Sequence, residues 1–279
     1  MFSVKPSMQN FLMKSSRFLL NQRRYRSFPW FLAKEILCYM LAWLKKDNMP
    51  CQKFIIFCSP RVGSGLLSGL LNLHPDIHVD DVILSHNRVK KLFFPIRYIK
   101  GYSLAFEKPV YGFKIHPANL AYQKLDAQKF LLKLHQAGWK IIHMKRANIV
   151  RQQISLMIAT QRNQWIDTVE NSLKNSKYYI NIEEFIKKIQ RQETHLFNEK
   201  KVLEQIPHIT ITYEDDLLIA GQHQKTADRV FEYLGIESIP VKTQFKRTTT
   251  DKLSDFIENY EEIVSVLCQT KYAKFIDDD

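Results

Sequence analysis

Short apolar runs alternate with amphipathic stretches along most of this chain, and each run has the length of a buried strand. Four runs are rich in β-branched or aromatic residues and predict strands at residues 52–57, 110–115, 139–144 and 208–213. Apolar residues at helical spacing follow them, over residues 66–71, 125–137, from 148 onward and 224–234. Because strands separated by helices need crossover connections, the pattern predicts an α/β fold whose central, mostly parallel sheet is flanked by helices.

Glycine is scarce, with 8 residues in the whole chain, so each glycine is informative. Gly138 and Gly235 directly follow predicted helices and predict left-handed C-caps there. Residues 162–206 are polar and favour helix.

Residues 1–50 differ from the rest and predict an N-terminal extension to a main domain over residues 51–279. A basic segment comes first, and an apolar segment over residues 30–44 follows, interrupted by two charged residues. This segment is shorter than the roughly 20 apolar residues of a transmembrane helix, and it lacks the small-residue cleavage site of a signal peptide. Two functions of this segment are favoured over a true membrane span: a helix packed on the domain, or peripheral contact of residues 1–46 with an anionic membrane surface.

The charge balance favours some classes of binding partner over others. Lys and Arg number 41 against 28 Asp and Glu, a net charge of +13, which favours nucleic acid, acidic membranes or phosphorylated small molecules. The sequence contains no nucleic-acid-binding motif, which argues against the first. The 4 cysteines form no C-x-x-C pair and no N-x-[ST] sequon occurs. These features predict a reduced, cytoplasmic protein, membrane-associated if the N-terminal segment binds lipid.

Residues 59–67 form a loop with two glycines between a predicted strand and a predicted helix. Backbone amides in such a loop, together with those of the helix N-terminus, make an anion cradle. A Walker A loop would need Lys after its last glycine, whereas this loop has Arg61 before its glycines. The loop therefore predicts phosphate binding without the chemistry of a P-loop kinase. The simpler alternative is a structural turn.

The loop sequence Ser-Pro-Arg-Val-Gly-Ser-Gly-Leu-Leu resembles the 5′-phosphosulfate loop of the sulfotransferase superfamily, which usually reads P-R-[ST]-G-S-T-L-L. These enzymes use 3′-phosphoadenosine-5′-phosphosulfate (PAPS), and the resemblance implies a P-loop NTPase-like sulfotransferase fold. Arg61 falls near the transferring sulfuryl group, and Gly65 replaces the usual Thr, so Ser64 would carry more of the 5′-phosphate contact. The implied PAPS-binding residues of the loop are Arg61, Val62, Gly63, Ser64, Gly65 and Leu66.

Residues 143–155 run from a strand end into a helix and carry a second pair of cation and hydroxyl. A cation at the strand tip and a serine two turns into the helix can converge on one phosphate. The segment resembles the family's 3′-phosphate element in its R-x-N-x-x-R-x-x-x-S form. This implies Arg146 and Ser155 as ligands, with Lys145 in reserve, although the commoner family spacing would put the Arg at Ala147. The alternative is an amphipathic helix with a solvated basic first turn.

Two later segments match the same family in the same order. Residues 211–217 resemble its Y-E-D-L element, in which Tyr213 and Glu214 are usually structural, and residues 253–262 resemble its C-terminal helix. Cations just before that helix are implied to close over the 3′-phosphate, or are solvated loop charges: Lys246 and Arg247 first, and Lys242 more weakly.

Sulfuryl transfer needs a group that stabilises charge on the leaving oxygen and a base for the acceptor. The resemblance gives Arg61 the first role, with Lys114 as a second candidate. The family's base is often a Glu, and an alignment with one gap puts Asp81 at its position, with His116 or His86 as alternatives. The sequence shows no metal-ligand cluster, and the family needs none.

The sequence thus predicts a sulfotransferase that moves a sulfuryl group from PAPS to a hydroxyl or amine of a carbohydrate, lipid or other small acceptor. The product nucleotide would be 3′-phosphoadenosine-5′-phosphate (PAP). A P-loop nucleotide kinase is disfavoured by the missing Lys. Two alternatives remain: a degenerate member that binds PAP or PAPS without turnover, and a basic protein that binds membrane surfaces.

Overall fold

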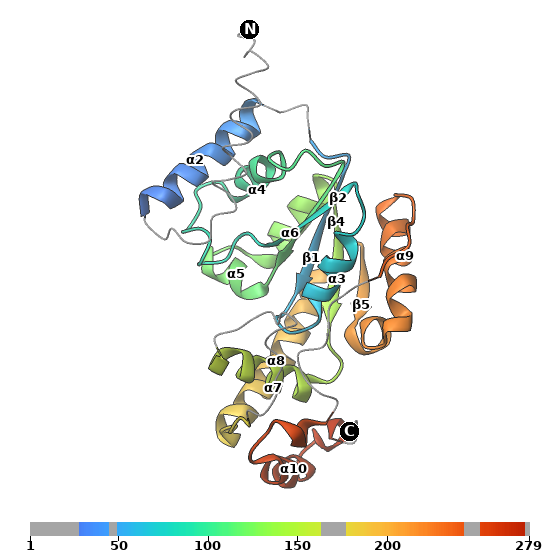
Figure 1. Ribbon diagram of the computed structural model, residues 1–279. Helices are drawn as coiled ribbons and strands as arrows, with labels where there is room; N and C mark the ends of the chain where they lie inside the picture. The colour runs from blue at the N-terminus through green and yellow to red at the C-terminus, as the bar shows by residue number, and fades with distance from the viewer. Residues whose placement is uncertain (1–27, 45–48, 163–176, 243–251, 277–279) are drawn as a thin grey trace. The chain divides into compact units, whose positions relative to one another are not determined.

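The computed structural model describes residues 28–44, 49–162, 177–242 and 252–276. Five strands form a parallel sheet in the order β2-β3-β1-β4-β5, and helices connect successive strands (Figure 1). The strands are β1 (Gln52–Cys58), β2 (Ile77–Val82), β3 (Val110–Ile115), β4 (Trp139–Lys145) and β5 (His208–Thr212). The predicted α/β fold, with helices flanking a parallel sheet, is confirmed.

The described helices include all four that the apolar spacing predicted. Gly138 (φ +84°) and Gly235 (φ +74°) are left-handed just beyond two of them, as expected of C-caps. The α-helices are α2 (Phe28–Leu44), α3 (Ser64–Leu71), α4 (Pro95–Ser103), α5 (Pro117–Tyr122), α6 (Ala127–Gln136), α7 (Ile149–Arg162), α8 (Ile182–Leu203), α9 (His223–Leu234) and α10 (Tyr260–Cys268).

The chain forms two compact units. The first contains residues 1–57, 71–142 and 206–208, and therefore holds β2, β3, α2, α4, α5, α6 and nearly all of β1. The second contains residues 58–70, 143–205 and 209–279, and holds α7 to α10 and nearly all of α3.

The strand β2 was missed by the sequence pattern. Only Ile77 and Val79 are buried apolar residues in it, and two aspartates follow them. The strand lies at the end of the sheet order and pairs with β3. The side chain of Asn72 hydrogen-bonds the backbone of Val79 twice, accepting from its N–H at 2.8 Å and donating to its carbonyl at 3.1 Å. A short edge strand stabilised in this way needs no continuous apolar run.

The expected helix over residues 253–262 is wrong in its position. A 3₁₀ turn covers Leu253–Asp255, and the α-helix begins only at Tyr260. Between this turn and the α-helix, the backbone of residues 256–258 pairs with that of Tyr178. The Tyr178 N–H donates to the Phe256 carbonyl at 2.8 Å, and the Tyr178 carbonyl accepts from the Glu258 N–H at 3.0 Å. Because this bridge uses the backbone groups that a helix would need, the helix is displaced toward the C-terminus.

In the first unit, α2 packs directly on α4 (Figure 1). Gly101 makes this approach possible, since a Cβ on it would overlap the Cys38 carbonyl of α2. The Glu35 carboxylate accepts from the Phe93 N–H at 3.0 Å, and the Tyr39 hydroxyl accepts from the Phe94 N–H at 2.8 Å. The apolar N-terminal segment is therefore a helix packed on the first unit. None of the described helices has the length and apolarity needed to cross a membrane.

In the second unit, α7, α8 and the C-terminal segment share one apolar core. Ile154 and Met157 of α7, Phe185 and Ile189 of α8, and Phe256 are all buried in it. This core fixes the orientation of α7, which carries Ser155 of the predicted 3′-phosphate element.

We predict that Gly101→Ala destabilises the protein by about 1–3 kcal/mol, because the added methyl must displace backbone rather than a flexible side chain. Urea unfolding followed by circular dichroism measures the change. Gly221→Ala is the matched control, because a Cβ at Gly221 has no atom within 4 Å. Equal unfolding midpoints for the two variants would contradict the packing described.

Candidate functional site

The loop after β1 has a backbone conformation suited to an anion. Arg61 (φ +65°) and Gly63 (φ +82°) are both left-handed, which is uncommon for a residue with a side chain. The Leu67 N–H donates to the Gly63 carbonyl at 3.1 Å and starts the helical bonds of α3. The amides of residues 63–66 therefore have no partner within the helix, and the helix dipole favours negative charge in front of them.

A hydrogen bond joins this loop to α7. The Arg61 Nε donates to the Ser155 Oγ at 2.9 Å, and Ser155 is only 9% exposed. A second bond runs from the Gln152 Nε2 to the Pro60 carbonyl at 2.8 Å. The structure thus brings together the cation of the first predicted element and the serine of the second.

Tyr213 contacts both elements. A Cβ on Gly63 would lie 2.5 Å from its ring carbon Cδ2, so the loop can pack on the ring only because residue 63 is glycine. The guanidinium carbon of Arg146 lies 4.7 Å from the centroid of the same ring, a cation–π distance. Gly63 of the loop and the Arg146 cation therefore both pack against the ring of Tyr213, which belongs to the Y-E-D-L segment.

Glu214 organises the start of α7. Its carboxylate accepts from the backbone N–H groups of Ala147 at 2.7 Å and Asn148 at 3.1 Å, and it forms a 3.4 Å ion pair with Arg146. The Asn148 side chain adds an N-cap by accepting from the Arg151 N–H at 2.8 Å. Burial lowers the pKa of Arg146 although Tyr213 and Glu214 oppose this, and a guanidinium stays charged throughout.

Glu199 of α8 is a residue that sequence reasoning missed. It is 1% exposed, accepts from the Ser59 hydroxyl at 2.6 Å, and its second oxygen lies 3.1 Å from the His143 Nε2. It thereby ties the start of the loop to the C-terminal end of β4. The available signal was a carboxylate on an otherwise largely apolar stripe at helical spacing: Phe185, Ile189, Gln192, Leu196, Glu199 and Leu203.

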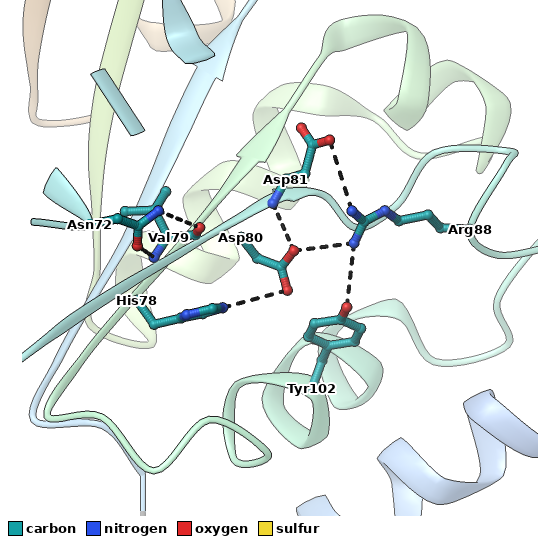
Figure 2. A network of polar contacts seen from close by, with 7 residues as sticks. All are labelled: Asn72, His78, Val79, Asp80, Asp81, Arg88 and Tyr102. Atoms are coloured by element: carbon teal, nitrogen blue, oxygen red, sulfur yellow. Dashed lines mark hydrogen bonds and ion pairs between the residues drawn. The ribbon is translucent and has the colours of Figure 1, made fainter. Parts of the chain in front are cut away.

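The first unit holds a separate polar cluster at the end of β2 (Figure 2). Asp80 is buried and accepts from the Arg88 Nη1 at 3.1 Å and from the Asp81 N–H at 2.7 Å. Asp81 is skipped in the strand register, where Asp80 pairs with Phe113 and Val82 with Lys114. Its carboxylate forms ion pairs with the Lys114 Nζ at 2.9 Å and with Arg88 at 3.8 Å.

The pairing of Asp81 changes its chemistry. Burial alone would raise the pKa of Asp81, but the charge and hydrogen bond of Lys114, helped by Arg88, outweigh burial and lower the pKa to about 2. A carboxylate with so low a pKa is a weak base, since the ideal general base has a pKa near the working pH. The predicted general base, Asp81, and the second candidate for stabilising the leaving oxygen, Lys114, are thus engaged with each other.

The remaining predicted residues fall in several places. His116 occupies the N-cap of α5, and its N–H donates to the Asn119 Oδ1 at 3.1 Å. His86 is exposed, with its ring 6.1 Å from that of Tyr122.

The predicted phosphate-binding residues differ in exposure. Within the loop Val62 is buried, Gly65 is exposed, and Ser64 and Leu66 are half-buried. Lys246 and Arg247 lie outside the described residues, whereas Lys145 is half-buried and Lys242 exposed. Over the described ranges, no group of three His, Cys, Asp or Glu could hold a metal ion.

Comparisons with known proteins find a similarity in structure and none in sequence. No family model matches the sequence, and no curated protein matches it. Among solved structures, the chain is similar to the crystal structure of a sulfotransferase from Alicyclobacillus acidocaldarius, with 14% identity and a TM-score of 0.46 over 81% of this chain and 94% of that one. Similarity at this level leaves function to be argued from the residues of the site.

We predict opposite outcomes for the two loop glycines. Gly63→Ala must accommodate a left-handed alanine against the Tyr213 ring and is expected to cost about 1–3 kcal/mol of folding stability. Gly65→Ala adds a methyl into open space within a helix and is expected to gain about 0.5–1 kcal/mol. Urea unfolding of both variants decides, and a neutral Gly63→Ala would refute the contact with Tyr213.

We also predict that Asp81 titrates near pH 2 in the folded protein, measured from its side-chain carboxyl carbon by NMR. Because this pKa is below the unfolded value of 3.8, the ion pair stabilises the protein above about pH 4, and the stabilisation is lost as the pH falls toward 2. Lys114→Met removes the largest contribution that lowers this pKa and should raise the midpoint above about 2. Lys133→Met, an exposed position of α6, should leave it unchanged.

Proposed function

We propose that this protein is a sulfotransferase that transfers a sulfuryl group from PAPS to a hydroxyl or amine of an acceptor. The observation that carries the proposal is the hydrogen bond from Arg61 to Ser155. It joins two elements that the sequence marked independently, one for a 5′-phosphosulfate and one for a 3′-phosphate. A ligand with anionic groups at both ends suits such a pair of elements.

The loop would bind the 5′ end. Its amides at residues 63–66 are oriented by the start of α3, and its left-handed backbone at Arg61 and Gly63 supports a concave anion site. Bound PAPS supplies the sulfuryl group and leaves as PAP. The Arg61 guanidinium would offset charge that develops on the 5′-phosphate oxygen as its bond to sulfur breaks.

The start of α7 would bind the 3′-phosphate. Ser155 can donate its hydroxyl proton, and Arg146 is held in place by the ring of Tyr213 and by Glu214. A guanidinium that is already fixed loses less conformational entropy on binding a phosphate. Recognition of a 3′-phosphate is what would separate PAPS from ADP or ATP.

On the acceptor side, Asp81 remains the first candidate for the general base, with His116 as its alternative and Lys114 as a cation for the transferring group. The role of Asp81 rests on the resemblance alone, and those of His116 and Lys114 on their place at the end of β3. A carbohydrate or lipid acceptor is the class that the resemblance favours.

A second candidate function is binding of PAP or PAPS without turnover. The observation that favours it is the 2.9 Å ion pair between Asp81 and Lys114, which lowers the pKa of Asp81 to about 2 and makes this carboxylate a poor base. The two candidates share the nucleotide site and differ only in catalysis.

Thermal shift with PAP and with ADP tests the nucleotide site. PAP at 100 times its dissociation constant should stabilise the fold by about 2.7 kcal/mol, and ADP clearly less. Arg146→Ala and Ser155→Ala should weaken PAP binding, the latter by about tenfold or more, because a hydrogen bond to a charged group is lost. Thr160→Ala removes an exposed hydroxyl from the same helix and is the matched control. Gly65→Thr should tighten binding, since open space at residue 65 accepts the hydroxyl that the family uses.

Transfer of radiolabelled sulfur from PAPS to a panel of glycans and lipids then separates the two candidates. Labelled product supports the transferase, and PAP binding without any product supports the binding protein. Equal shifts with PAP and ADP, or none with either, would contradict both.

A further inference from the structure

The helix α2 buries its two charged residues and exposes a row of apolar side chains. Lys34 is 2% and Glu35 7% exposed, although they are the two charged residues of the helix. Glu35 is held there by its bond to the Phe93 N–H. The opposite face carries apolar side chains at helical spacing, with their exposed fractions: Leu32 40%, Ile36 48%, Met40 48%, Trp43 79% and Leu44 44%.

The segment leading into α4 continues this surface. Phe93 is 78%, Phe94 59% and Ile96 38% exposed. A hollow of about 660 Å³ lies between Trp43 and these residues. We call the exposed apolar side chains of α2 and of residues 93–96 the apolar face. Scattered single apolar residues on a surface are ordinary, whereas a contiguous set of this size marks an interaction site.

The charges around the apolar face are positive. Residues 85–104 contain five cations and no carboxylate, and Glu35, the one carboxylate of α2, is buried. Lys90, Lys91 and Arg97 are exposed, and Arg97 and Lys100 line the hollow itself. An apolar surface rimmed by cations is complementary to an anionic lipid bilayer, whose acyl boundary takes the apolar side chains and whose headgroups take the cations.

We propose that the apolar face docks this protein on an anionic membrane surface. The helix α2 would lie in the interface plane with Trp43 at headgroup level, where tryptophan is favoured. Spanning is the wrong geometry, because 17 residues give a helix about 26 Å long whose charged residues are fixed inside the protein. This inference is independent of the proposed sulfuryl transfer, since it uses other residues and another ligand.

Flotation of the full chain with vesicles tests the proposal. Binding is expected to vesicles of phosphatidylcholine mixed with phosphatidylserine, to be weak to phosphatidylcholine alone, and to fall with added salt. Vesicles with brominated acyl chains should quench part of the tryptophan fluorescence, and Trp43→Phe should remove that part.

Two pairs of variants separate the apolar and ionic contributions. Met40→Ser with Trp43→Ser should weaken binding by about tenfold or more, whereas Phe197→Ser with Ile219→Ser, at exposed apolar positions of the second unit, should not. Arg97→Gln with Lys100→Gln should weaken binding by about tenfold at low salt, and Lys187→Gln with Lys200→Gln on α8 should have a smaller effect.

Several results would overturn the proposal. Absence of flotation, or flotation that both apolar pairs reduce equally, excludes this face as the lipid contact. A dimer in light scattering that Trp43→Ser dissociates would assign the face to a second copy of the chain. A large loss of thermal stability in Met40→Ser without any lipid effect would show that the chain's own residues cover the face.

Discussion

The hydrogen bond between the Arg61 Nε and the Ser155 Oγ joins parts of the chain that are 94 residues apart. It closes a small assembly in which the loop after β1 and the start of α7 share one set of neighbours. Gly63 and Arg146 both contact Tyr213, and Gln152 of α7 holds the loop backbone at Pro60. The function proposed for the protein depends on this joint, because either element alone is only a turn or a basic helix terminus.

Two carboxylates, Glu199 and Glu214, stabilise this arrangement of the loop and α7. Glu199 bonds Ser59 and His143, and Glu214 binds the amides at the start of α7 and the Arg146 side chain. A carboxylate buried without partners would cost several kcal/mol, so the buried Glu199 constrains its partners strongly. The cation that would meet a phosphate is therefore partly neutralised and held in position before any ligand arrives.

The sequence specified the parts that depend on local chemistry. Apolar runs identified β1, β3, β4 and β5. The glycine loop and the Y-E-D-L segment were also recognised from the sequence, and in the second unit Gly63 of the loop packs against Tyr213 of that segment. Edge strand β2 was missed because Asp80 and Asp81 interrupt its apolar pattern and Arg88 and Lys114 neutralise them only in the folded chain. The role of Glu199 depends on partners 56 and 140 residues away, which no local pattern reveals. The orientation of α2 was equally hidden in the sequence, since Glu35 is held by the Phe93 N–H and Lys34 lies over the ring of Tyr102, both far away along the chain.

Hydrogen–deuterium exchange of the full chain with PAP tests the shared site most directly. We predict slower exchange in peptides covering residues 62–67 and in peptides covering residues 146–156 when PAP is saturating, because one ligand would contact both elements. Protection of only one of these segments, or of neither while PAP is bound, would contradict a single site for both phosphates.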